Sequence, residues 1–187
     1  MAVRPTTTLP VHRLDVETYN RMVASGALDD ERVELLDGVL VDVSPASPAH
    51  TTVVTRLMRH FAAEPRWWTR VQCPLEIPPR AEPEPDLAVL AEEPPSDRHP
   101  RTALLVVEVA VSSYMIDRNV KGPQYAHAGI PVYWLINVPA GAIEVLTEPG
   151  PDGYARCETY NQGRCIPSPL DGVDDVDVSQ LLAGVTD

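Results

Sequence analysis

The alternation of hydrophobic and polar residues along the chain predicts a mixture of helices and strands. Apolar residues with helical spacing, together with capping signals, predict helices over residues 14–25, 50–63, 117–128 and 178–182. Short apolar or alternating runs predict a hairpin over 32–43, strands over 67–77, 86–90, 103–111 and 132–138, and an edge strand over 143–146. Asp37-Gly38 marks the hairpin turn, because this dipeptide favours the backbone of tight β-turns.

The strand over 103–111 is almost continuously apolar, which is typical of a central strand buried on both faces. The chain contains no internal repeat and no linker long enough to separate two domains. We therefore expect residues 1–187 to form a single α/β (α+β) domain, in which one mixed sheet is flanked by helices. Its core would span about 14–160, and the segment after Pro149 reads as a turn-rich tail before the last short helix.

Composition excludes several classes of protein. The chain has 187 residues, enough to bury a core, and no apolar run approaches the roughly 20 residues of a membrane span. Residues 1–10 lack the apolar region of a secretory signal, so a cytoplasmic location is expected. Cys73, Cys157 and Cys165 are odd in number and form no CxxC pair, which argues against a disulfide framework or a structural zinc site.

The formal net charge of −12 argues against tight, nonspecific binding to DNA. It does not exclude a nuclease, because a bound divalent metal ion offsets the carboxylate charge at its site.

Two carboxylates stand where a metal site could form. Glu108 interrupts the most apolar strand, and an unpaired carboxylate buried there would cost several kcal/mol. Asp86 opens the preceding strand. If the two strands pair, facing residues have Cβ atoms about 5 Å apart, close enough to share one cation. Oxygen ligands favour Mg²⁺ or Mn²⁺. The alternatives are an arginine partner for Glu108 and a chance Pro-Asp pair in a chain with 20 prolines.

Lys121 is the only lysine among 15 basic residues. It lies on the predicted helix after the central strand, where a compact ammonium could stand beside an attacking water. Asp117 precedes it by one helical turn, and an i,i+4 pair would orient the ammonium. The alternative is a surface lysine retained by chance.

Two further residues are candidates for the same site. Glu34, on the first arm of the hairpin, points to the opposite face from its apolar neighbours, and it lies either at the site or on a solvated strand face. His50 begins the second predicted helix and could donate a hydrogen bond to a ligand. Otherwise it is an exposed histidine at a helix start.

The order of these segments resembles the Uma-two family, within the PD-(D/E)XK nuclease superfamily. The resemblance covers about residues 14–160. It is carried by Val33-Glu34-Leu35-Leu36-Asp37-Gly38, Ser44-Pro45 with His50, Pro85-Asp86-Leu87-Ala88-Val89, Val107-Glu108-Val109, Asp117-Arg118 with Lys121, and Tyr125 through Gly129-Ile130-Pro131 to Tyr133-Trp134.

The resemblance implies a restriction-endonuclease-like fold and a role for each candidate. Glu34, Asp86, Glu108 and Lys121 would be catalytic, and the metal would be held by Asp86, Glu108 and the carbonyl of Val109. His50 and Asp117 would support these ligands. The superfamily lysine normally lies two residues after the glutamate, where this chain has Ala110, so Lys121 must reach in from the helix. Val111-Ser112-Ser113 and Val132 also depart from the family pattern.

We therefore expect an Mg²⁺- or Mn²⁺-dependent endonuclease that hydrolyses phosphodiester bonds, with DNA as the substrate implied by the resemblance. A homodimer is a reasonable expectation, because cleavage of a duplex needs two sites. Ala110 and the net charge favour a different class, a catalytically silent module of the same fold that acts through a protein partner or dimerisation. A third possibility is a hydrolase of a small phosphorylated substrate.

Overall fold

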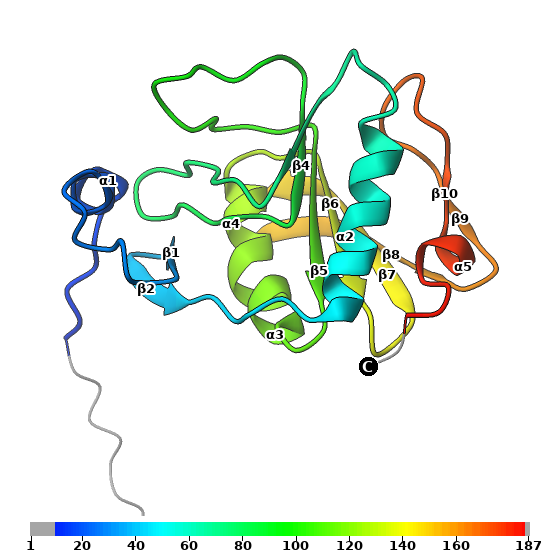
Figure 1. Cartoon of the computed structure of the whole chain (residues 1–187), viewed down its shortest axis with the longest axis horizontal. Coiled ribbons are helices and arrows are strands. Elements are labelled where there is room, and N and C mark those ends of the chain that lie inside the picture. The colour runs from blue at the N-terminus through cyan, green and yellow to red at the C-terminus, as the bar shows by residue number, and fades with distance from the viewer. Residues whose placement is uncertain (1–9, 186–187) are drawn as a thin grey trace, which may run out of the picture.

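The computed structural model describes residues 10–185 and is built around one six-stranded mixed β-sheet that lies between two groups of helices (Figure 1). The sheet has the strand order β3-β4-β5-β6-β7-β8, and all neighbours are antiparallel except β5 and β6. Its strands are β3 (Trp68–Val71), β4 (Leu87–Leu90), β5 (Leu105–Ala110), β6 (Val132–Asn137), β7 (Ala142–Gly150) and β8 (Gly153–Asn161). This mixed, helix-flanked sheet confirms the predicted fold class.

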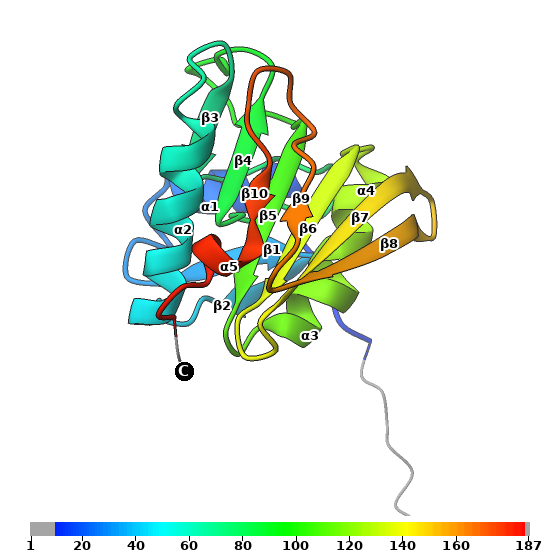
Figure 2. The ribbon, with the colours of Figure 1, turned by 90° about the vertical axis from the view of Figure 1, so that its right-hand side faces the viewer.

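One face of the sheet packs against α2 (Pro48–Phe61), as Figure 2 shows. The apolar stripe of α2, including Leu57 and Phe61, contacts strand residues such as Val107 and Trp134. The last part of the chain also packs here, through β9 (Cys165–Ile166), β10 (Val176–Asp177) and α5 (Val178–Leu181). The buried core therefore extends beyond residue 160.

The other face is covered by three consecutive helical segments, α3 (Tyr114–Ile116), the π-helical turn η1 (Asp117–Lys121) and α4 (Gly122–His127). Side chains of β5 alternate between the two faces, so Val107 and Val109 meet α2 whereas Val106 and Ala110 meet α4. Because side chains alternate along a strand, Glu108 points to the same face as Val106 and Ala110. The strand pattern thus directs this carboxylate towards α4.

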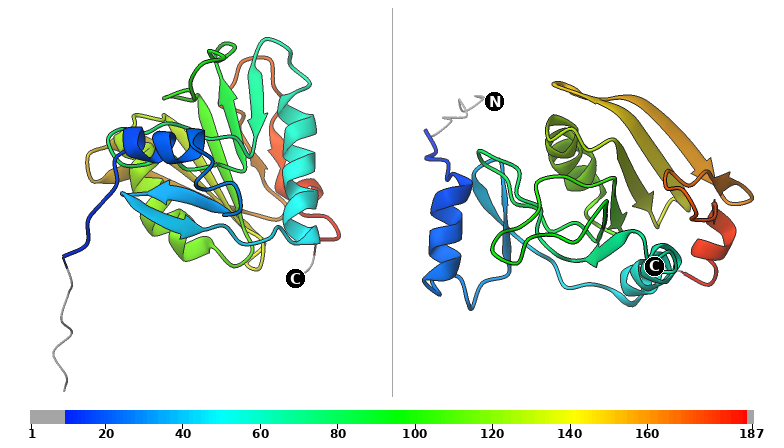
Figure 3. Two further views of the ribbon diagram at one scale, coloured as in Figure 1. Left: turned by 60° about the vertical axis from the view of Figure 1, so that its left-hand side comes forward. Right: turned by 90° about the horizontal axis from the view of Figure 1, so that it is seen from above.

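A small module made of α1 (Val16–Ala24), β1 (Val33–Leu36) and β2 (Val39–Asp42) lies at one side of the main sheet (Figure 3). Asp15 caps α1 by accepting a hydrogen bond from the Thr18 N–H. Asp37 and Gly38 both have positive φ, which confirms the predicted tight turn. A Cβ at Gly38 would lie 2.6 Å from the Cβ of Arg13, so the turn also needs glycine for space.

Several predicted boundaries were wrong. The helix predicted over 50–63 begins at Pro48, because Ser47 provides its N-cap. The strand predicted over 67–77 ends at Val71. The segment 143–146 is not an edge strand, because it belongs to the longer β7, which pairs with β6 and β8. The segment after Pro149, predicted to be rich in turns, contains β8, which is one of the two edge strands of the sheet.

Candidate metal and catalytic site

The register of β4 and β5 places Asp86 opposite Glu108. The ladder pairs Leu87 with Val107, so the next pair outward is Asp86 with Glu108. The two residues are in contact, because the Asp86 N–H lies 3.4 Å from Glu108 Oε2 and donates to it. Strand pairing therefore places the two predicted residues next to each other, and their contact joins the Asp86 main chain to the Glu108 carboxylate.

The Asp86 carboxylate is held by the neighbouring strand β5 and by α2. Its Oδ2 accepts the backbone N–H of Val109 at 2.8 Å, at a point where the β4–β5 ladder has ended. Its Oδ1 lies 2.8 Å from Nε2 of His50, in the first turn of α2. The hydrogen bond to Asp86 raises the pKa of His50 above its usual value, although burial opposes the shift. His50 thus orients the Asp86 carboxylate, and it is largely buried rather than exposed.

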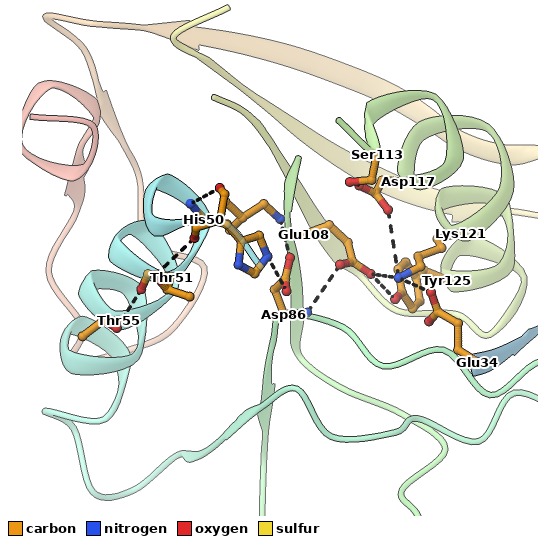
Figure 4. Close-up of polar contacts among 12 residues, drawn as sticks. Glu34, His50, Thr51, Thr55, Asp86, Glu108, Ser113, Asp117, Lys121 and Tyr125 are labelled. Carbon is orange, nitrogen blue, oxygen red and sulfur yellow. Dashed lines mark hydrogen bonds and ion pairs between the residues drawn. The ribbon is translucent and has the colours of Figure 1, made fainter. Parts of the chain in front are cut away.

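Glu108 is 3% exposed and its Oε1 meets two donors from the helix that faces it. The Tyr125 hydroxyl donates to Oε1 at 2.7 Å, and Lys121 Nζ lies 3.2 Å from the same oxygen. Oε2 instead faces Asp86. The two oxygens of one carboxylate therefore have different environments, as Figure 4 shows.

Lys121 is buried among carboxylates, with 6% of its surface exposed. Its Nζ lies 2.9 Å from Glu34 Oε1, 3.2 Å from Glu108 Oε1 and 4.0 Å from Asp117 Oδ1. The expected i,i+4 partner is thus the most distant of the three. Asp117 is held instead by the Ser113 hydroxyl, which donates to its Oδ2 at 2.5 Å.

The π-helical turn η1 carries Lys121 into this position. Pro123 has no N–H and its ring crowds the preceding turn, which favours a wider helical turn at this point. The Asp117 carbonyl accepts from Gly122 N–H and, at 3.1 Å, from the buried Tyr133 hydroxyl. A Cβ at Gly122 would lie 3.3 Å from both that carbonyl and the Tyr133 ring, so the close packing here favours glycine.

Glu34 joins the site from the separate β1–β2 hairpin. Its Oε2 accepts the Glu84 N–H at 2.9 Å, and its Oε1 contacts Lys121. The side chain is 6% exposed, so the solvated strand face considered from the sequence is wrong for this residue. The β1–β2 hairpin and η1 are therefore joined through a buried ion pair.

The cluster contains more acid than base. Four carboxylates, those of Glu34, Asp86, Glu108 and Asp117, surround the ammonium of Lys121 and the imidazole of His50. Burial raises the pKa of Glu108 well above its usual value, and the positive charge of Lys121 offsets only part of this rise. Burial likewise raises the pKa of Asp117. Burial alone would lower the pKa of Lys121, but the carboxylates outweigh it and raise that pKa.

The six predicted site residues are thus linked by direct contacts, from His50 through Asp86 and Glu108 to Lys121, Glu34 and Asp117, and Val109 takes part through its main-chain N–H. Sequence reasoning missed Tyr125, Ser113 and Tyr133 as members of the site. A usable signal existed for Tyr125, because it follows Lys121 by four residues and so lies on the same helical face. Residues 10–185 contain no group of three His, Cys, Asp or Glu side chains arranged to hold a metal ion on their own.

Comparison with known proteins identifies the family. The model of the family described as "Uma2: Putative restriction endonuclease" matches residues 16–178. The chain belongs to the Uma2 family. The resemblance read from the sequence is thereby confirmed. No curated protein gives a match.

A solved structure shares the fold of this Uma2 protein. It is described as "a putative nuclease belonging to DUF820 from Anabaena variabilis ATCC 29413", and it superposes with a TM-score of 0.66 at 11% sequence identity. The alignment covers 82% of this chain and 91% of that chain. At this identity the likeness shows the fold. In the described part of the Uma2 chain, no helix has the length and apolar character needed to cross a bilayer.

Proposed function

We propose that this Uma2 protein is a metal-dependent nuclease that hydrolyses phosphodiester bonds in DNA. The observation that carries the proposal is the buried cluster around Lys121, in which four carboxylates face one ammonium and one imidazole. Even with Lys121 and His50 both charged, two negative charges remain without a counterpart when all four acids are ionised. A divalent cation would neutralise them.

The donor set fits Mg²⁺ or Mn²⁺. Mg²⁺ usually takes one or two protein carboxylates and completes its shell with waters and substrate phosphate, so three acidic side chains are not required. Asp86, Glu108 and the Val109 carbonyl would hold the ion, and Glu34 would support a second ion or act on water through Lys121. His50 adds a second sign of an incomplete site, because its buried Nδ1 has no hydrogen-bond partner among the described residues.

When bound, the metal ion would polarise the scissile phosphate and make a coordinated water more acidic. The chain's own residues perform the remaining tasks. Tyr125 and Lys121 hold Glu108 Oε1, and His50 and the Val109 N–H hold the Asp86 carboxylate. Lys121 places a positive charge where the phosphate gains negative charge as water attacks phosphorus and the P–O bond to the leaving oxygen breaks.

The family and the shared fold support nuclease chemistry. Ala110 stands where the superfamily normally has its lysine, and Lys121 would take over the role of that lysine. Ala110 is fully buried against the α4 side of the sheet, where a lysine would be too large. The ammonium reaches Glu108 from η1 instead. The family description, a putative restriction endonuclease, supports DNA as the substrate.

The test is cleavage of supercoiled plasmid with Mg²⁺ or Mn²⁺ by the wild type, Asp86→Ala and Lys121→Ala. We expect both variants to lose cleavage, whereas Glu17→Ala, a change at an exposed pair on α1, should cleave normally. Unchanged cleavage in both site variants would refute the assignment. Calorimetric titration with Mn²⁺ distinguishes a silent scaffold, which would show no binding that depends on Asp86.

A further inference from the structure

The free edge of β8 is an unpaired strand of unusual length for a sheet edge. β8 contains nine residues and pairs with β7 along its other side. In residues 10–185 no strand pairs with its outer side, and Figures 2 and 3 show β8 at the margin of the sheet. An exposed edge offers unpaired N–H and C=O groups to another strand.

The middle of β8 lacks several of the features that commonly block such pairing. Residues 155–159 are all exposed and contain no proline or lysine. The ladder is interrupted on the partner strand, where Glu148, which has positive φ, lies opposite Ala155, between the pairs Thr147–Arg156 and Pro149–Tyr154. The charged residues that are present, Arg156 and Glu158, have opposite signs and form an ion pair at 3.0 Å within the strand.

Residues 155–159 can pair with the same segment of a second, antiparallel copy so that opposite charges face each other. In an antiparallel pair of two β8 strands centred on Cys157, Arg156 of each copy faces Glu158 of the other, and Ala155 faces Thr159. Facing side chains of opposite charge stabilise such a pair, whereas like charges oppose it. A twofold axis through the centre satisfies both copies at once, as an isologous dimer requires.

From this self-complementarity we infer that β8 is the interface of a symmetric homodimer, in which the main sheet continues from one copy into the other. The occupant of the edge is thus a second copy of this chain. The inference does not depend on nuclease activity. It goes beyond the proposed function because it assigns a surface and a register.

Charge reversal tests the register. Arg156→Glu places two glutamates opposite each other at each end of the contact, and Glu158→Arg places two arginines there. Each single change should raise the dimer dissociation constant on the order of tenfold or more, and the double change should restore it. Sedimentation velocity from low to high micromolar concentration measures these constants, and circular dichroism checks that each variant is folded.

Cysteine cross-linking tests the centre of the contact independently. Cys157 is exposed at the proposed axis, whereas Cys165 is exposed on β9 outside it. A short thiol cross-linker should join two wild-type or Cys165→Ser chains and should fail with Cys157→Ser. A wild type that stays monomeric at every concentration overturns the inference. A dimer whose dissociation constant is unchanged by the single charge reversals also overturns it, as does a dimer that is cross-linked only through Cys165.

Discussion

The ammonium of Lys121 lies between Glu34 and Glu108, two buried carboxylates from different sheets of the molecule. Removing the ammonium should leave both acids without their main counter-charge. We expect Lys121→Met to lower the free energy of unfolding at pH 8 by about 3 to 5 kcal/mol, the usual cost of breaking a buried ion pair. Urea unfolding measures this change.

The same variant should regain stability in acid. Burial already raises the pKa of Glu108, and the loss of Lys121 would raise it further. A carboxyl with a raised folded pKa favours the native state below its unfolded pKa and loses that advantage as pH increases through the folded pKa. The defect should therefore be smaller at pH 5 than at pH 8. Combining Lys121→Met with Glu108→Gln is the control, and it should reduce the pH dependence.

Glu82 supplies a second pH-dependent contribution, outside the Lys121 cluster. Burial raises the pKa of Glu82 to about 7, and the hydrogen bond from Asn20 only partly opposes this. The folded protein binds this proton more tightly than the unfolded chain, so stability should fall between pH 4.5 and 7 as the carboxyl ionises. The full shift corresponds to roughly 3 kcal/mol. Urea unfolding of Glu82→Gln at pH 5 and pH 8 should show a smaller difference than the wild type does.

An exposed glutamate provides the control for that measurement. Glu17→Gln on α1 removes an acid of the same type whose ion pair with Arg21 is exposed. This variant should keep the wild-type difference between pH 5 and pH 8. An equal difference in all three proteins would show that Glu82 does not titrate in this range.

Metal binding should be visible as stability without any substrate. A ligand that binds only the folded protein stabilises it by about 2.7 kcal/mol at one hundred times its dissociation constant. We therefore expect Mn²⁺ to raise the midpoint of thermal unfolding of the wild type. Asp86→Asn should abolish the increase, and Asp171→Asn, an exposed change in the C-terminal segment, should retain it. A wild-type midpoint independent of Mn²⁺ would contradict the proposed metal site.

Much of the site could be predicted because its residues break strong local patterns. Glu108 is conspicuous in an apolar strand, and Lys121 is conspicuous as the only lysine. The strands that carry Asp86 and Glu108 pair as expected, which makes these two residues neighbours. In these cases the unusual residue type was itself the signal.

The parts that could not be predicted depend on contacts between distant segments. Glu34 sits on an alternating strand that looks like any half-exposed hairpin, and its burial results from Lys121 and the Glu84 N–H. β8 was missed for the opposite reason. Both faces of its middle residues are exposed, so no alternation of apolar and polar residues marks it as a strand.

A substitution at Tyr125 can distinguish the packing role of its ring from the role of its hydroxyl in the site. Its ring is fully buried beside Tyr133, and its hydroxyl donates to Glu108 Oε1. Tyr125→Phe keeps the ring and removes one donor, so Glu108 should be less well oriented. We expect Mn²⁺ affinity or kcat to fall about 10- to 100-fold, as is usual when the partner of a metal ligand is lost. Tyr154→Phe removes a hydroxyl that donates to the Ile130 carbonyl outside the site and should leave both values unchanged. Equal behaviour of the two variants in calorimetry and cleavage assays would mean that the Tyr125 hydroxyl serves only the packing of the core.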